Sequence, residues 1–208
     1  GPTLQEAIQD WKAPSNPNSA ALLRTQLISR GDNFRGIAGT VHQGVFKVGN
    51  EVTIFPSAKS AKISKIVTFE KEITSANSGE AVTLVLEPEV DVARGDVIST
   101  SAEELSAADR FSAHIVWLDE EALIHSRSYM LYSGPSATPA MITKIKHRLD
   151  VNSGEHLSAD TLNMNDIGDV EIATDLAMVL KPYETSREFG NFILVDRLTQ
   201  RTVGAGMI

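Results

Sequence analysis

The sequence predicts an all-β protein with two consecutive domains, each an antiparallel barrel or sandwich, preceded by one short helix. Most of the chain consists of short segments rich in β-branched residues and bounded by Gly, Asn, Ser or Pro. These segments follow one another without helical periodicity between them, which is typical of all-β folds. At 208 residues, the chain is long enough for two domains of ordinary size.

The N-terminal residues 1–12 are predicted to form the helix. Leu4, Ala7, Ile8 and Trp11 recur at helical spacing, and Pro2 stands where a first turn tolerates proline. The Gly-Pro start fits native residues or a tag remnant equally well. The following stretch, APSNPNS (13–19), combines prolines, asparagines and serines, and we expect it to be a linker.

The first predicted β domain covers residues 19–104. Its expected strands lie in LLRTQLIS (22–29), IAGTV (37–41), VGNEVTIFP (48–56), KISKIVTFE (62–70), EAVTLVLE (80–87) and GDVIST (95–100). Gly49 and Asn50 predict a tight hairpin between Val48 and Val52. The acidic, alanine-rich stretch SAEELSAAD (101–109) is expected to connect the two domains.

The second predicted β domain covers residues 105–208. In RFSAHIVWL (110–118), alternation places Phe111, Ala113, Ile115 and Trp117 on one face and His114 on the opposite, solvent side. Further strands are expected in SYMLY (128–132), AMITKIKHRL (140–149), GDVEIATDLAMVL (168–180), NFILVDRL (191–198) and RTVGAGMI (201–208).

The closing segment RTVGAGMI alternates small and apolar residues. An extended backbone puts Val203, Ala205 and Met207 on one face. Gly204 and Gly206 then fall on the other face, where a close approach or a sharp bend requires glycine.

Composition limits the possible partners and compartments. The 27 acidic and 19 basic residues give a net charge of −8, which weakly disfavours nucleic acid. The absence of cysteine excludes disulfides, thiolate zinc sites and cysteine nucleophiles, and it fits a cytoplasmic protein. No apolar run approaches the ~20 residues of a membrane helix, so no membrane partner is expected.

Motifs for nucleotide hydrolysis or acyl transfer are absent from the sequence. None of the 14 glycines is followed by lysine, so there is no phosphate-binding P-loop. Asn-Lys-x-Asp, Asp-x-x-Gly and Gly-x-Ser-x-Gly are missing as well. We therefore expect this chain to be non-catalytic and to hold no cofactor.

The histidines and acidic pairs give weak signals for a site. His147 and His156 flank a turn that contains Asp150 and Glu155, so a metal site is conceivable, but ordinary loop histidines are the favoured interpretation. The acidic runs Glu103-Glu104 and Asp119-Glu120-Glu121 fall in expected loops. General acid–base chemistry needs a carboxylate in an apolar pocket, so we predict neither catalysis nor a metal there.

Lys59, Lys62 and Lys65 recur every three residues. In a strand, Lys59 and Lys65 share a face and Lys62 takes the other. The set indicates either a solvated sheet edge guarded by lysines or a docking patch for an acidic partner. Structural glycines are easier to interpret: Gly39, Gly44, Gly49 and Gly95 each interrupt a β segment, where positive φ or close backbone packing is expected.

A family resemblance extends over essentially the whole chain. FRGIAGTVHQGVFKVGNEVTIFP together with SGEAVTLVLEPEVDVARGDVI resembles the second domain of translation-factor-like GTPases, and RTVGAGMI is similar to the last strand of their third domain. With KIVTF, IVWL and ILVDRLTQRTVGAGMI, the chain resembles the large subunits of heteromeric ATP sulfurylases more narrowly. GPTLQEAIQDW is similar to the last helix of their GTPase domain.

The resemblance implies two β-barrels of the elongation-factor domain 2 and domain 3 type. It implies that the glycines of the closing strand allow the second barrel to close and that Val203, Ala205 and Met207 face its core. It also implies a GTPase domain that ends within residues 1–18 and carries GTP and Mg²⁺, and a small catalytic subunit that makes adenosine 5′-phosphosulfate. The barrels are then expected to couple the two, with Phe34, Arg35 and the three lysines as partner contacts. The alternative is an RNA-binding barrel pair like that of the elongation factors, against which the net charge and the 6% of aromatic residues argue.

Overall fold

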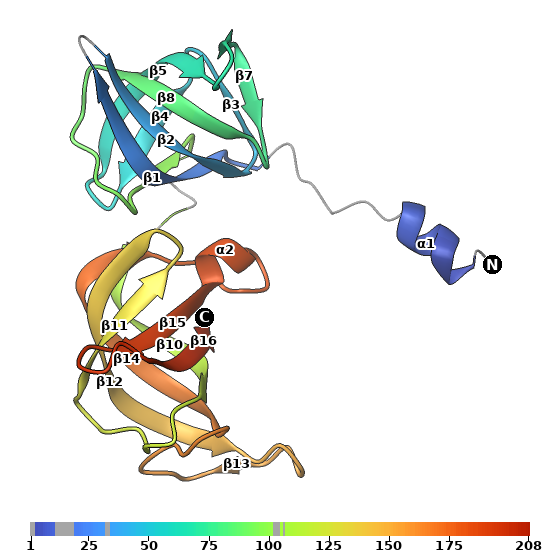
Figure 1. Ribbon diagram of the computed structural model, residues 1–208, viewed down its shortest axis with the longest axis vertical. Coiled ribbons are helices and arrows are strands. Elements are labelled where there is room, and N and C mark those ends of the chain that lie inside the picture. The colour runs from blue at the N-terminus through green and yellow to red at the C-terminus, as the bar shows by residue number, and fades with distance from the viewer. Residues whose placement is uncertain (1–2, 11–18, 32–33, 102–104, 106) are drawn as a thin grey trace.

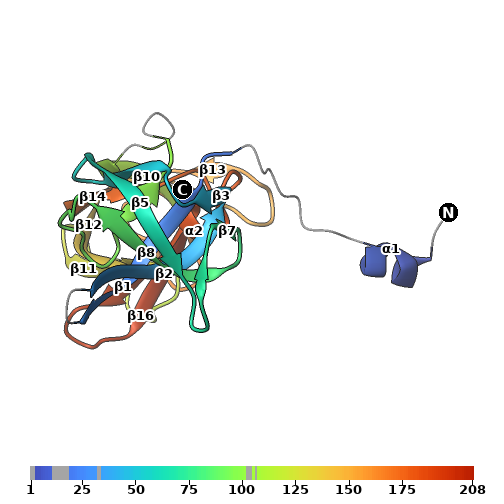
Figure 2. The same ribbon diagram turned by 90° about the horizontal axis from the view of Figure 1, so that it is seen from above.

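The computed structural model describes residues 3–10, 19–31, 34–101, 105 and 107–208. Two barrels stack along the long axis of the molecule (Figure 1), and a view along that axis places one over the other (Figure 2). The N-terminal helix α1 spans Leu4–Asp10, which lies within the predicted 1–12. Thr3 and Glu6 bond reciprocally through backbone N–H and side-chain oxygen, which caps its first turn. Trp11, Gly1-Pro2 and most of the predicted linker lie outside the described residues.

The first barrel closes six antiparallel strands in the order β4-β9-β1-β2-β8-β5, with β5 pairing back to β4. A seventh strand, β6, extends β5, and β3 pairs with β7 in a separate two-stranded sheet. The strands are β1 (Leu22–Gly31), β2 (Phe34–Gln43), β3 (Val45–Lys47), β4 (Glu51–Phe55), β5 (Lys59–Val67), β6 (Glu72–Ile73), β7 (Ser75–Asn77), β8 (Ala81–Glu87) and β9 (Val97–Ser99).

The second barrel closes six antiparallel strands in the order β11-β15-β16-β10-β14-β12, with β12 pairing back to β11. A short strand, β13, extends β12, and the four-residue helix α2 (Arg187–Gly190) precedes β15. The strands are β10 (Ala107–Trp117), β11 (Ser128–Ser133), β12 (Ser136–Leu149), β13 (His156–Leu157), β14 (Ile167–Val179), β15 (Asn191–Asp196) and β16 (Thr202–Met207).

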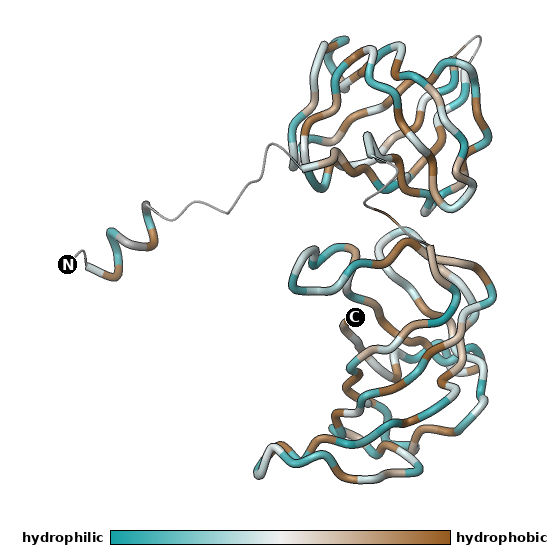
Figure 3. The backbone as a smooth tube through the Cα atoms, turned by 180° about the vertical axis from the view of Figure 1, so that it is seen from behind, coloured by the Kyte–Doolittle hydropathy of each residue, from teal (hydrophilic) through white to brown (hydrophobic). Residues whose placement is uncertain are grey.

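Each barrel has its own apolar core, because alternate residues of every strand point inward. In β8, Val82, Leu84 and Leu86 are buried, and they pack in the first core. In β10, Ala113, Ile115 and Trp117 are buried as the alternation predicts, while His114 is exposed. Apolar residues therefore recur along the strands of both barrels (Figure 3). The antiparallel barrels expected from the sequence are confirmed.

The closing strand β16 differs from its predicted register. Val203 is buried, but Met207 is 45% exposed, whereas Gly204 and Gly206 are buried. The pairing with β15 is irregular between Leu194 and Val195, so one residue bulges and the alternation inverts after Val203. The expectation that Val203, Ala205 and Met207 share the core face was therefore wrong. The expected close approach exists on the glycine face, where a Cβ on Gly206 would meet the Phe192 ring.

Two local predictions also need correction in the first barrel. The Asn50 N–H donates to the backbone oxygen of Lys47, and the Lys47 N–H donates to Asn50 Oδ1, which closes a turn. The strands on either side do not pair with each other, because β3 pairs with β7, and β4 pairs with β5 and β9. The predicted hairpin at Gly49-Asn50 is therefore a turn between two sheets. The expected connection 101–109 is shorter than predicted, because β10 already begins at Ala107.

Candidate functional site: the interface between the barrels

The two barrels are joined by an apolar cluster of their own. It takes three buried residues from the first barrel (Leu22, Phe55 and Val97) and three from the second part of the chain (Leu105, Val179 and Phe189). Four consecutive residues that open β1 (22–25) are buried. A barrel strand normally buries alternate residues, so this run indicates that β1 is covered on both faces, by its own core and by the second barrel.

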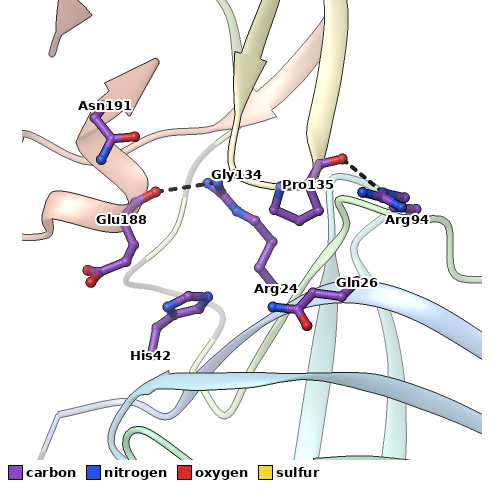
Figure 4. A pocket seen from close by; sticks show the side chains of 8 residues that line it. All are labelled: Arg24, Gln26, His42, Arg94, Gly134, Pro135, Glu188 and Asn191. Atoms are coloured by element: carbon purple, nitrogen blue, oxygen red, sulfur yellow. Dashed lines mark hydrogen bonds between the residues drawn. The ribbon is translucent and has the colours of Figure 1, made fainter. Parts of the chain in front are cut away.

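Arg24 crosses from β1 into the second barrel and is 2% exposed. Its Nη1 donates to the backbone oxygen of Ser133 at 2.8 Å and, more weakly, to that of Glu188 at 3.4 Å. Its Nη2 donates to the backbone oxygen of Val179 at 3.4 Å. The guanidinium carbon lies 4.2 Å from the centroid of the Phe189 ring, a cation–π contact. Figure 4 shows the side chain reaching between Gly134 and Glu188.

The charge of Arg24 is compensated by dipoles and a ring rather than by a contacting carboxylate. Among the described residues, no acidic group lies within ion-pair distance of its guanidinium, and Nε has no hydrogen-bond partner. Burial lowers the pKa of Arg24 to about 10, against the more distant charge of Glu188, and the residue stays cationic at neutral pH. Removing one half of such an arrangement leaves buried carbonyls unpaired.

His42, at the end of β2, packs its ring edge-on against Phe189, with the centroids 5.6 Å apart. Burial lowers the pKa of His42, the charge of Glu188 opposes that shift, and the charge of Arg24 adds to it. At neutral pH the imidazole is therefore neutral. Arg24 and His42 of the first barrel thus both contact the ring of Phe189 in the second barrel.

Hydrogen bonds from side chains to backbone oxygens connect the two barrels at a second point. The Ser136 hydroxyl donates to the backbone oxygen of Gly95 at 3.1 Å, and Arg94 Nε donates to that of Pro135 at 3.4 Å. A Cβ on Gly95 would lie 2.7 Å from Ser136 Oγ and 3.1 Å from its Cα. Only glycine permits this approach, and with φ at +95° the backbone itself favours glycine.

A hollow of about 530 Å³ opens where the barrels meet. Its lining, drawn in Figure 4, comes from both barrels and carries mostly polar side chains: Arg24, Gln26, His42, Arg94, Gly134, Pro135, Glu188 and Asn191. The described lining offers guanidinium, amide and imidazole groups and the carboxylate of Glu188, and it contains no hydroxyl or thiol side chain.

The predicted structural glycines occupy three kinds of position. Gly44, Gly49 and Gly95 have positive φ. Gly39 and Gly206 face neighbours that a Cβ would strike, the backbone of Arg24 and the ring of Phe192 respectively. Gly204 is less restricted, since its nearest neighbour would stand 3.4 Å away.

The predicted partner contacts lie away from the interface, on the first barrel. Phe34 is 38% exposed at the start of β2, and Arg35 beside it pairs with Asp91 at 3.4 Å and Glu89 at 3.9 Å. The lysine prediction was wrong in two respects. An irregularity between Ile63 and Lys65 places Lys62 and Lys65 on the same outer side, because Ile63 and Ile66 are both buried. Strand β5 is also no edge, since it pairs with β4 and β8.

The weaker candidates do not converge on a site. His147 and His156 stack with ring centroids 3.9 Å apart, and in the described part of the chain no group of three metal-capable side chains occurs. Asp119 pairs with Arg201 and accepts from the backbone of Glu121, so it stabilises a loop. Glu103-Glu104 lies outside the described residues.

Comparison with known proteins identifies the relatives of this chain. Residues 110–208 match the GTP-eEF1A C-terminal domain-like family model. Sulfate adenylyltransferase subunit 1 of Teredinibacter turnerae is 36% identical over 209 residues, which cover 100% of this chain and 45% of that protein. The chain is a homologue of sulfate adenylyltransferase subunit 1. Bifunctional enzyme NodQ of Azospirillum brasilense is 41% identical over 211 residues, which cover 100% of this chain and 34% of NodQ.

A solved structure agrees on the fold. Sup35 complexed with GDP superposes with a TM-score of 0.85 over 100% of this chain and 51% of that one, at 20% identity. The chain thus shares the two-barrel fold of that structure. It spans less than half the length of the subunit 1 and NodQ relatives named above. None of its described helices has the length and apolarity to cross a membrane.

The central residues of this interface were not singled out from the sequence. Arg24 lies within the predicted strand LLRTQLIS, where an arginine is an ordinary exposed residue. Phe189 lies in a polar stretch before NFILVDRL. A signal did exist in the run of apolar residues from Ala20 to Leu23, which is denser than a half-exposed strand requires. No signal in a single sequence pairs that run with Phe189.

Proposed function

We propose that this chain is the barrel module of the large subunit of a GTP-dependent sulfate adenylyltransferase, a cytoplasmic enzyme of sulfate activation. In the whole protein, a GTPase domain that holds GTP and Mg²⁺ would precede the barrels. A small catalytic subunit would form adenosine 5′-phosphosulfate from ATP and sulfate. The barrels would hold these two parts in fixed geometry and pass the nucleotide state from one to the other.

One observation carries the proposal: the barrels share a buried interface built around Arg24, in a homologue of sulfate adenylyltransferase subunit 1. A pair of barrels that moves as one body transmits a displacement at one end to the other without loss. A chain connected only by a flexible linker absorbs that displacement. Coupling between sites amounts to ~1–3 kcal/mol, which a few differential contacts supply.

The module needs contacts with both neighbours. Phe34, Lys59 and Lys62 are exposed, and Arg35 and Lys65 are already paired with acidic groups of the same barrel. As partner contacts, these five residues stay predictions. The first three are the better candidates, since a new contact there breaks no ion pair seen among the described residues.

The test uses the full-length large subunit with its small subunit. The Arg24→Ala variant is expected to keep GTP hydrolysis but to lose most of the GTP-dependent formation of adenosine 5′-phosphosulfate. Arg30→Ala, an exposed arginine on the same strand, is the matched control. If Arg24→Ala folds and couples GTP to sulfate activation as well as the wild type does, the barrels are not the coupling element.

The second candidate function is RNA binding, which the resemblance to elongation factors implies. The net charge of −8 argues against it. Binding of tRNA by the full-length protein that weakens steeply with salt would support this alternative. No measurable tRNA binding at low salt would remove it.

A further inference from the structure

A second hollow adjoins the one between the barrels and is more apolar. It measures about 440 Å³ and shares Gly134 and Asn191 with its neighbour. Its remaining lining is mainly apolar and aromatic: Tyr132, Tyr183, Phe192, Ile193, Ala205, Gly206 and Met207. We call these two adjoining hollows, which meet at Gly134 and Asn191, the groove; its second part is lined mainly by residues of β11, β15 and β16.

The apolar half of the groove lies on the outer face of the second barrel. Tyr132 pairs with Ile193, and Ile193 pairs with Ala205, so the three form one cross-strand row. Tyr132, Ile193 and Met207 remain 38%, 40% and 45% exposed. Ala205, the smallest of the three, ends the row on β16. Outer faces of barrels are normally polar, so an apolar row here needs an explanation.

The polar half of the groove carries an excess of positive charge. Arg94 is exposed and bonds only weakly, at 3.4 Å, to a backbone oxygen, and Arg24 lies beneath with its charge unpaired among the described residues. Against these two guanidiniums, the described lining contains a single carboxylate, Glu188. In a chain of net charge −8, this is a local cationic site.

We propose that this groove is the docking site for an extended segment of a partner protein in which an acidic residue adjoins apolar ones. The carboxylate of the segment lies against Arg94, in the positive field of Arg24. The apolar side chains lie on Tyr132, Ile193 and Met207. The inference rests on the proposed function for the identity of the partner, which is the small catalytic subunit.

Two observations favour a protein segment over a small molecule. The groove is an open trough rather than an enclosed pocket, and it changes from cationic to apolar along its length, as a peptide with both kinds of side chain requires. The groove also continues directly from the interface of the two barrels. A segment seated there contacts both barrels at once and senses any change in their arrangement.

The experiment measures the affinity of the small subunit for the full-length large subunit and for two variants. Arg94→Glu and Ile193→Asp are each expected to weaken binding about tenfold or more, through charge reversal and loss of apolar contact respectively. Arg94→Lys, which keeps the charge, is expected to stay within about threefold. Arg30→Glu and Leu198→Asp are the controls, because both residues are exposed outside the groove, and they are expected to bind like the wild type.

The outcomes separate this inference from the proposed function. If the wild-type large subunit does not bind the small subunit, the proposed function fails and the inference fails with it. If the wild type binds and the two groove variants bind equally well, the small subunit docks elsewhere and only the inference is overturned. Unchanged binding together with a lower melting temperature of the groove variants means that these residues stabilise the fold and not a contact with the partner, and it also overturns the inference.

Discussion

The guanidinium of Arg24, on the first barrel, lies over the ring of Phe189, on the second, 4.2 Å from its centroid. This contact stands at the centre of an apolar cluster and is bordered by hydrogen bonds to backbone oxygens of the second barrel. A buried cation held by carbonyls and a ring depends on geometry, because no contacting carboxylate attracts it from another direction. The relative position of the barrels is therefore fixed at this point.

Truncation of Arg24 is expected to destabilise the chain strongly. Arg24→Ala leaves the backbone oxygens of Ser133 and Val179 without this donor and opens a space beside Phe189. We expect the free energy of unfolding to fall by about 2–4 kcal/mol, measured by urea denaturation. Arg30→Ala, on the exposed end of the same strand, is expected to change it by less than ~0.5 kcal/mol. Equal effects of the two substitutions would contradict a special role for Arg24.

Gly95 and Gly79 form a matched pair that isolates the second contact between the barrels. Their φ angles are +95° and +90°, but a Cβ on Gly79 meets nothing within 4 Å, whereas one on Gly95 meets Ser136. Gly79→Ala is expected to cost ~1 kcal/mol from backbone strain. Gly95→Ala is expected to cost about 1–2 kcal/mol more, because Ser136 must move. Thermal denaturation of both variants measures the difference, and a difference near zero means that the barrels are not closely packed at Gly95.

Gly206 and Gly204 test the inverted register of the last strand. A Cβ on Gly206 would overlap the Phe192 ring, while one on Gly204 would stand 3.4 Å from its nearest neighbour. We expect Gly206→Ala to lower the free energy of unfolding by about 2–3 kcal/mol and Gly204→Ala by at most ~1 kcal/mol. Adding Phe192→Leu to Gly206→Ala is expected to cost less than the two single losses summed. Strict additivity would show that the two side chains do not compete for space.

The lowered pKa of His42 predicts that the chain loses stability on mild acidification. Burial lowers the pKa of His42 in the folded chain, whereas the unfolded imidazole titrates near 6.5. As the pH falls through the unfolded pKa, the unfolded chain takes up a proton that the folded chain resists, so the free energy of unfolding decreases until the folded pKa is passed. Denaturation midpoints at pH 7.5 and pH 5.5 measure this decrease. His42→Gln is expected to reduce it, and an unchanged pH dependence in that variant would assign the effect to other groups.

The sequence predicted the class of fold because alternation and turn residues are local signals. Ala113, Ile115 and Trp117 followed their alternation into the core, and both antiparallel barrels formed as expected. The errors occurred at bulges. One extra residue in β16 turned Gly206 inward and Met207 outward, and an irregularity in β5 brought Lys62 and Lys65 to one side. A bulge depends on how a strand pairs with its neighbour, so it cannot be predicted from the sequence of that strand alone.

The residues of the interface between the barrels could not be predicted from sequence patterns, for a different reason. Arg24 and Phe189 are 165 positions apart, and each reads as an ordinary strand or loop residue in its own segment. Gly95 was expected to be a structural glycine, but the close approach that requires glycine there is made by Ser136 of the other barrel. Local patterns report which face of a strand is covered, not which distant residue covers it.

The central claim is that the two barrels move as one body, and the rotational diffusion of the folded chain tests it most directly. Backbone ¹⁵N relaxation gives a rotational correlation time for β1–β9 and another for β10–β16. The two times are expected to be equal in the wild type and to diverge in Arg24→Ala. Two different and shorter correlation times in the wild type would mean that the barrels tumble separately, and the proposed transmission of the nucleotide state through them would be contradicted.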